Sequence, residues 1–175
     1  PIWLKQKLEE ILSADIGRGD LTTNSIVPPE HHSEAVFLAK EDGILAGLPI
    51  AEQVFRLLEP AIEFTPLAKE GDAIHKGQVL AKVQGPTWAI LSGERTALNL
   101  LQRLSGIASA TRKLVDLTQG YKAKVTDTRK TMPGLGILDK YAVRVGGGVN
   151  HRMGLDDAVL IKDNHIAVAG SNVVV

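Results

Sequence analysis

The pattern of strands and connections after Gly120 constrains the fold more than any other part of the sequence. Residues 121–128 (YKAKVTDT) predict a strand, and residues 157–165 (DAVLIKDNH) predict a second, apolar strand with a polar end. The stretch between them, residues 136–147, is typical of a helix or turn region. A strand, a connection and a further strand indicate a parallel sheet or an α/β barrel.

Residues 1–105 have a different pattern, which predicts an α+β domain. The first expected element is a helix with an apolar stripe at Leu4, Leu8, Ile11 and Leu12, followed by two strands within 34–47 that a turn at Glu41–Gly43 joins. A second helix is expected over 50–59, starting near Pro49, with an apolar stripe at Ile50, Val54, Leu57 and Leu58. An antiparallel sheet with glycine-rich turns is expected within 63–85.

A long helix follows this sheet. Ser92 is expected to cap it, Gly120 to end it, and its inner stripe is Ala97, Leu101, Leu104 and Ala108. Ser105–Gly106 is a place where the helix can kink or split, because glycine inside a helix costs about 1 kcal/mol relative to alanine. We therefore divide the chain into residues 1–105, an open-faced α/β sandwich, and residues 106–175, the first part of an α/β barrel.

Composition narrows the function. Lysine and arginine number 20 and the acidic residues also number 20, which argues against a broad nucleic-acid surface. The absence of cysteine excludes disulfides, thiolate chemistry and thiolate-bound metals. No apolar run is long enough to span a bilayer, and no secretion-type start is visible. We expect a cytoplasmic protein that uses neither nucleic acid nor membrane as a partner.

Polar and cationic residues gather at the ends of the two predicted strands. The first strand leads into TRKT (128–131), the second ends in KDNH (162–165), and GGGVNHR (146–152) lies between them. Barrel enzymes place functional groups at such strand ends, and guanidinium groups and glycine-rich loops suit anions. Each piece alone has a plainer interpretation, a solvated turn for Arg129–Lys130 or a surface ion pair worth under about 1 kcal/mol for Lys162–Asp163. Together they predict an anion site.

Four stretches also carry a family resemblance: EDGILAGLPIAEQVF (41–55), GERTALNLLQRLSGIASAT (93–111), DTRKTMPGLGILDKYAVRVGGGVNHRMGL (127–155) and LIKDNHI (160–166). In this order they resemble the quinolinate phosphoribosyltransferase family, also called nicotinate-nucleotide pyrophosphorylase (carboxylating). The resemblance implies a barrel of the type II phosphoribosyltransferase kind. It also implies transfer of a phosphoribosyl group from phosphoribosyl pyrophosphate to quinolinate with decarboxylation, in NAD biosynthesis. Mg²⁺ is the implied cofactor.

The resemblance also assigns residues. Arg129, His151, Arg152 and Lys162 are expected to hold the quinolinate carboxylates, and Lys130 and Thr131 to lie between quinolinate and the phosphoribosyl group. Lys130 and Lys162 are the expected catalytic residues. Arg95 is expected to reach the site of a neighbouring subunit, because the family forms homodimers with shared active sites.

Two departures from the family accompany the resemblance. Gly136 stands where the family commonly has arginine. A complete barrel takes roughly 250 residues, so we expect the barrel in this chain to be incomplete, the acidic metal ligands to lie outside it, and the chain alone to be an incomplete enzyme. The alternatives are a molybdenum-associated relative with another substrate, and a carrier module built on EGDAIHKGQVL (70–80), which lacks the modifiable lysine hairpin.

Overall fold

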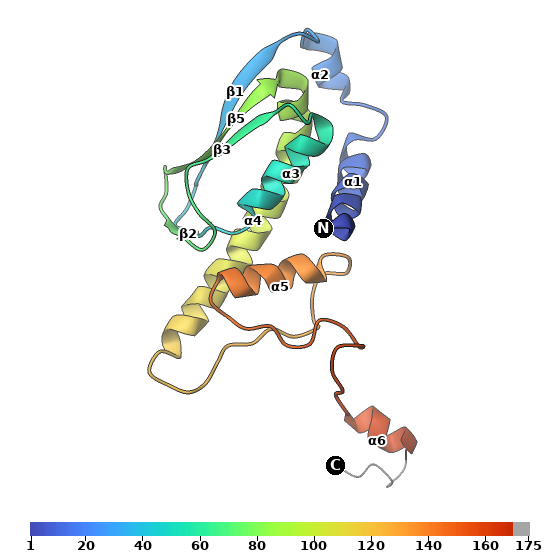
Figure 1. Ribbon diagram of the computed structural model, residues 1–175, viewed down its shortest axis with the longest axis vertical. Coiled ribbons are helices and arrows are strands. Elements are labelled where there is room, and N and C mark those ends of the chain that lie inside the picture. The colour runs from blue at the N-terminus through green and yellow to red at the C-terminus, as the bar shows by residue number, and fades with distance from the viewer. Residues whose placement is uncertain (170–175) are drawn as a thin grey trace.

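The computed structural model describes residues 1–169. An antiparallel sheet forms one layer and the helices packed on it form the other, while the last described residues extend away from both (Figure 1). The helices are α1 (Ile2–Ile16), α2 (Leu21–Ile26), α3 (Leu48–Leu58), α4 (Thr87–Leu117), α5 (Gly136–Val145) and α6 (Asp163–Ala169). The strands are β1 (His32–Leu38), β2 (Gly43–Ile44), β3 (Glu63–Pro66), β4 (Ala73–Ile74) and β5 (Val79–Pro86).

The main sheet has the order β1-β5-β3, and both pairings are antiparallel. The two strands expected within 34–47 are present, but they lie in different sheets, because β2 pairs with β4. The backbone explains the separation: Ala39 pairs with residues 77 and 78 beyond the end of β1, and Leu45 N–H donates to Asp72 O at 3.0 Å. The chain therefore leaves the main sheet before β2 begins.

The core lies between this sheet and helices α3 and α4. Three aromatic rings join α3 to the sheet, with centroid distances of 6.0 Å from Phe37 to Phe55 and 5.9 Å from Phe37 to Phe64. Of the predicted stripe on α3, Ile50 and Val54 are buried, whereas Leu57 and Leu58 are partly buried and pack against the edge of the core. All four predicted stripe residues of α4 are buried.

Helix α4 is one unbroken helix, which corrects two predictions from the sequence. It begins at Thr87 after Pro86 instead of at Ser92, and Ser92 Oγ donates to Asp20 at 3.1 Å. No split occurs at residues 105–106, because Ser105 packs against the chain beside β2, where its hydroxyl accepts from Ala46 N–H at 3.0 Å. The proposed domain boundary thus falls within a helix that contacts α3 through one part and α5 through another (Figure 1).

Of the two strands predicted after Gly120, the first keeps only an isolated parallel bridge from Thr126 to Val149, a residue of the stretch expected to connect the strands. The second is not formed, and its last residues belong to α6. Residues 158–161 form no strand and are exposed. A strand of a parallel sheet takes its hydrogen bonds from neighbouring strands, and residues 158–161 have no such neighbour within the part of the chain described here. Residues 170–175 lie outside the described residues. Within residues 1–169, no helix combines the length and apolarity needed to cross a membrane.

Candidate active site

The parallel bridge brings two of the predicted site segments to one edge. Val149 N–H donates to Val125 O at 2.9 Å, and Asp127 N–H donates to Val149 O at 3.2 Å. Because the two segments run in the same direction, the residues that follow each of them emerge on the same side. The segment 128–131 and the segment 150–152 therefore start side by side, whereas the end of the second predicted strand, residues 162–165, is not brought to this edge.

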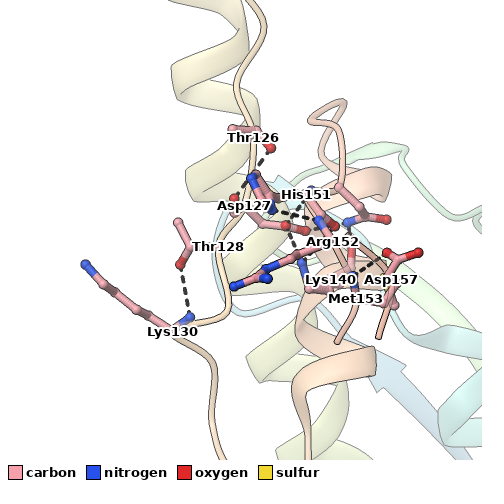
Figure 2. Close-up of polar contacts among 10 residues, drawn as sticks. Thr126, Asp127, Thr128, Lys130, Lys140, His151, Arg152, Met153 and Asp157 are labelled. Atoms are coloured by element: carbon pink, nitrogen blue, oxygen red, sulfur yellow. Dashed lines mark hydrogen bonds and ion pairs between the residues drawn. The ribbon is translucent and has the colours of Figure 1, made fainter. Parts of the chain in front are cut away.

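Asp127 is the centre of a buried polar network at this edge (Figure 2). Its carboxylate accepts from Lys140 Nζ and from Asn150 Nδ2, each at 2.5 Å, and from His151 N–H at 2.8 Å. The side chains of Asp127 and Lys140 are only 6% and 3% exposed. Lys140 Nζ also lies 3.3 Å from His151 O, so the network holds both backbone polar groups of His151.

A second carboxylate, Asp139, fixes the segment that contains residues 128–132. It forms a two-pronged pair with Arg103 of α4, with both N···O distances 2.8 Å, and accepts from Met132 N–H at 3.0 Å. Hydrogen bonding to Asp139 is the largest cause that raises the pKa of Arg103, which stays charged at any working pH. Two adjacent residues of α5, Asp139 and Lys140, therefore hold both site segments, through Met132 in one and His151 in the other.

The third consecutive polar residue of α5, Tyr141, connects this region to the sandwich. Its hydroxyl donates to Glu70, whose carboxylate accepts from Gly47 N–H and Leu48 N–H at the start of α3. Burial and then the hydrogen bond to Glu70 raise the pKa of Tyr141 well above its usual range. The bound carboxylate also stabilises α3, because helix N-termini favour negative charge.

Arg129 and Thr131 line a cleft of about 520 Å³ between the 129–136 segment and α1. Trp3 and Lys7 form the α1 side, and Gly136 forms part of the opposite side. A side chain at residue 136 would have to displace Thr131, since a Cβ there would lie 2.9 Å from Thr131 Oγ1. The position where the family commonly carries arginine thus lines this cleft but is closely packed against Thr131.

Lys130 faces away from this cleft and lines a smaller cavity of about 270 Å³ together with Asp127 and Thr131. Its N–H donates to Thr128 Oγ1 at 3.0 Å, which fixes the turn (Figure 2). Arg129 therefore lines the larger cleft and Lys130 the smaller cavity, and Thr131 lines both.

His151 and Arg152 follow the buried network directly. His151 Nδ1 accepts from Arg152 N–H at 2.8 Å, and Arg152 Nη1 donates to Ala158 O at 2.7 Å. His151 is exposed and Arg152 is half-buried, so both can reach a bound molecule. The segments that carry Arg129, Thr131, His151 and Arg152 thus lie side by side, although the Arg152 side chain lines a separate cleft with Ala158 and His165.

Lys162 and Arg95 are not brought to this region. Lys162 lies in the exposed segment that extends away from the body, where its N–H donates to His165 Nδ1 at 3.0 Å (Figure 1). Arg95 is exposed on α4, eight residues before Arg103, which corresponds to about 12 Å along a helix. Their expected roles stay predictions.

Sequence patterns do not indicate the buried supports of the site, namely Arg103, Asp139, Lys140 and Asn150. Lys140 and Asp139 lie within a helical pattern whose apolar positions include Leu138 and Ala142, and adjacent charges there resemble a solvated face. Nothing in that pattern marks Asp139 or Lys140 as buried.

Mg²⁺ does not fit the residues described. Among residues 1–169, no group of three or more histidine or acidic side chains could hold a metal ion. The two buried carboxylates at the site already bind Lys140 and Arg103. We therefore assign no chemical step to a metal here.

Comparison with known proteins gives a consistent result. Residues 20–105 match the family model for the N-terminal domain of quinolinate phosphoribosyl transferase, and residues 107–175 match the model for its C-terminal domain. The chain belongs to the quinolinate phosphoribosyl transferase family. The predicted resemblance is confirmed, and neither the molybdenum-associated relative nor the carrier module is favoured.

Individual members of the family show how much of it the chain spans. It is 51% identical over 169 residues to a probable nicotinate-nucleotide pyrophosphorylase (carboxylating) of Synechocystis, and 52% identical over 168 residues to one of Bacillus subtilis. These matches cover 97% and 96% of this chain but 56% and 58% of those proteins. The crystal structure of NadC from Streptococcus pyogenes matches with a TM-score of 0.92 and 42% identity, over 97% of this chain and 60% of that one. The fold described here is thus part of the quinolinate phosphoribosyl transferase fold.

Proposed function

We propose that this protein transfers a phosphoribosyl group from phosphoribosyl pyrophosphate to quinolinate and releases carbon dioxide, in NAD biosynthesis. The observation that carries the proposal is the pairing of Thr126 with Val149, which places the TRKT and NHR segments of a family member at one edge. Quinolinate carries two carboxylates and the second substrate carries a pyrophosphate group. A region with Arg129, His151 and Arg152 suits such anions, because guanidinium groups bind carboxylate and phosphate through two parallel hydrogen bonds.

The chemistry needs positioning more than a reactive side chain. The ring nitrogen of quinolinate forms a bond to C1 of the ribose while the bond from C1 to pyrophosphate breaks. The alkylated ring nitrogen then carries a positive charge, which stabilises the electron pair left on the ring carbon when the neighbouring carboxylate leaves as carbon dioxide. A proton from solvent completes nicotinate mononucleotide. The protein's cations contribute by holding both substrates in line and by balancing the charge of the leaving pyrophosphate.

The positions of individual residues support a role for each of them in this proposal. Arg129, His151 and Arg152 bind the carboxylates, and Thr131 lies between the cleft that contains Arg129 and the cavity that contains Lys130. This arrangement supports a role for Lys130 next to the phosphoribosyl group. Lys162 joins them as the second catalytic residue if the segment after residue 152 packs against this edge.

Four further features belong to the proposal. Residues 106–175 begin an α/β barrel, the protein acts as a homodimer in which Arg95 completes the partner's site, Mg²⁺ accompanies the pyrophosphate substrate, and the protein is cytoplasmic. The parallel bridge at residue 126 supports the barrel. The exposure of Arg95, away from the site of its own chain, supports the shared site.

The test is turnover by the protein encoded by the complete gene. Quinolinate labelled in the carboxylate next to the ring nitrogen should release labelled carbon dioxide, with one pyrophosphate and one nicotinate mononucleotide formed per turnover. Arg152→Ala should lower kcat/KM for quinolinate by about 10- to 150-fold, since it removes a charge-assisted hydrogen bond worth about 1.5–3 kcal/mol. Release of pyrophosphate without carbon dioxide would contradict the proposed reaction.

A further inference from the structure

Lys140 is a cation of the proposed site that is not free to bind a substrate. Lys140 is 3% exposed at its side chain, and its ammonium group already contacts the Asp127 carboxylate at 2.5 Å and His151 O at 3.3 Å. The other site cations Arg129, Lys130 and Arg152 are exposed or half-buried. Lys140 therefore differs from them both in burial and in partners.

The network formed by Asp127 and Lys140 holds a single residue from two sides. Asp127 accepts from His151 N–H at 2.8 Å, and Lys140 donates to His151 O. Asn150 Nδ2 joins the two, at 2.5 Å from Asp127 Oδ2 and 2.9 Å from Lys140 O. The direction in which the chain carries His151 and Arg152 is therefore set by this network.

Stability alone does not explain such a pair. Burying two charges costs solvation, and apolar replacements of a buried ion pair are often neutral or stabilising. An ion pair with fixed hydrogen-bond directions instead restricts the backbone that it contacts. The features that are fixed here are the N–H and C=O groups of His151, next to the residues proposed to bind the carboxylates.

We propose that Asp127 and Lys140 form a positioning pair that sets the placement of His151 and Arg152 for the quinolinate carboxylates. The inference rests on the proposed function and adds two residues to it. Neither side chain needs to touch the substrate. The pair acts through the backbone of His151, and its loss lets that backbone move while the fold is retained.

The test is a double-mutant cycle in the protein encoded by the complete gene, with Lys140→Met, Asp127→Asn and the double variant. Displacement by about 1 Å can cost about 100-fold in rate, so each single variant should lose about 100-fold in kcat/KM for quinolinate. The double variant should lose about the same and not the product, because both changes break one network. KM for phosphoribosyl pyrophosphate should stay near that of the wild type.

Thermal unfolding separates this role from simple structural support. Each single variant leaves one buried charge unpaired and should melt below the wild type, whereas the double variant has no buried charge here and should regain melting temperature without regaining activity. Tyr141→Phe is the matched control: it removes a buried hydrogen bond from the next residue of α5, and should lower the melting temperature while leaving KM for quinolinate unchanged.

Several results would overturn the inference. Folded single variants with unchanged kcat/KM for quinolinate, or multiplied losses in the double variant, would show that the two residues do not act as one positioning unit. Retained quinolinate activity in Asp127→Asn alone would show that the Asp127 carboxylate is not needed to place His151. If the single variants fail to fold, the double variant decides, and wild-type kinetics there would refute positioning. A wild-type protein inactive on quinolinate is a separate failure, that of the proposed function, and removes the basis of this inference as well.

Discussion

The pair between Arg103 and Asp139 gives the sharpest prediction for stability. Arg103→Met keeps the aliphatic stem against the core but removes two charge-assisted hydrogen bonds of 2.8 Å. Asp139, with a side chain only 9% exposed, keeps Met132 N–H as a donor but loses its opposite charge. Breaking a buried pair by removing one partner typically costs about 3–5 kcal/mol.

The expected cost is lower here because solvent reaches the arginine. Its side chain is 32% exposed, so water can enter the space it leaves and hydrate the carboxylate, and we expect a loss of about 2–3 kcal/mol. For a protein of this size, each kcal/mol lowers the melting temperature by roughly 2–4 °C. Arg103→Met should therefore melt about 4–12 °C below the wild type.

The measurement is differential scanning calorimetry on the purified protein at neutral pH, with Arg56→Met as the matched control. Arg56 pairs with Glu52 at a similar distance of 2.8 Å, but on the exposed surface of α3, where such pairs contribute about 0.3–0.5 kcal/mol. The control should shift by less than about 2 °C. Equal shifts in the two variants would refute the argument that burial makes the Arg103 pair strong.

Three further predictions address other parts of the structure. Gly146→Ala should lower the melting temperature by several degrees, because the added Cβ would lie 2.5 Å from Ala108 O, a backbone atom that cannot move aside. A melting temperature equal to that of the wild type would show that α4 and α5 pack less closely than described. The pKa of Tyr141 is raised in the folded protein, so the stability that Tyr141 contributes is complete below its unfolded pKa of about 10 and decreases as pH rises beyond that value. In urea unfolding, the difference in free energy of unfolding between the wild type and Tyr141→Phe should shrink from pH 9 to pH 11. A difference that stays constant would contradict this. Arg95→Ala and Arg152→Ala should each lose most of the activity, about 10-fold or more. Refolding an equal mixture should restore roughly a quarter of the wild-type activity, because half of the dimers are mixed and each of these has one intact site. Mixed dimers without recovered activity would place Arg95 outside a shared site.

Local pattern was sufficient to predict the sandwich. The stripe of α3 and the spacing of Ala97, Leu101, Leu104 and Ala108 on α4 follow from helical periodicity, which is a property of neighbouring residues. The start of α4 was predicted too late, because Ser92 resembles a capping residue while its hydroxyl in fact donates to Asp20. The pairing partners of the strands could not be predicted, because β1 pairs with β5 across a long stretch of chain and the periodicity of a strand does not specify its partner.

In the candidate site, too, some residues could be predicted from the sequence and others could not. Arg129 and Thr131 follow an expected strand, whereas His151 and Arg152 stand in the glycine-rich stretch expected between two strands. The bridge at Thr126 brings these segments together. The residues that hold them were not predictable, because the roles of Lys140 and Asp139 depend on which side of α5 faces Asp127 and Arg103. A buried ion pair between distant residues leaves no periodic signal in either segment.

Calorimetric titration with quinolinate and with nicotinate tests the central claim most directly, using the protein encoded by the complete gene. A site built from Arg129, His151 and Arg152 for two carboxylates should lose at least one charge-assisted hydrogen bond with the monocarboxylate, worth about 1.5–3 kcal/mol. The account predicts that quinolinate binds about 10- to 150-fold more tightly than nicotinate. Equal affinities for the two acids would contradict a site that recognises both carboxylates.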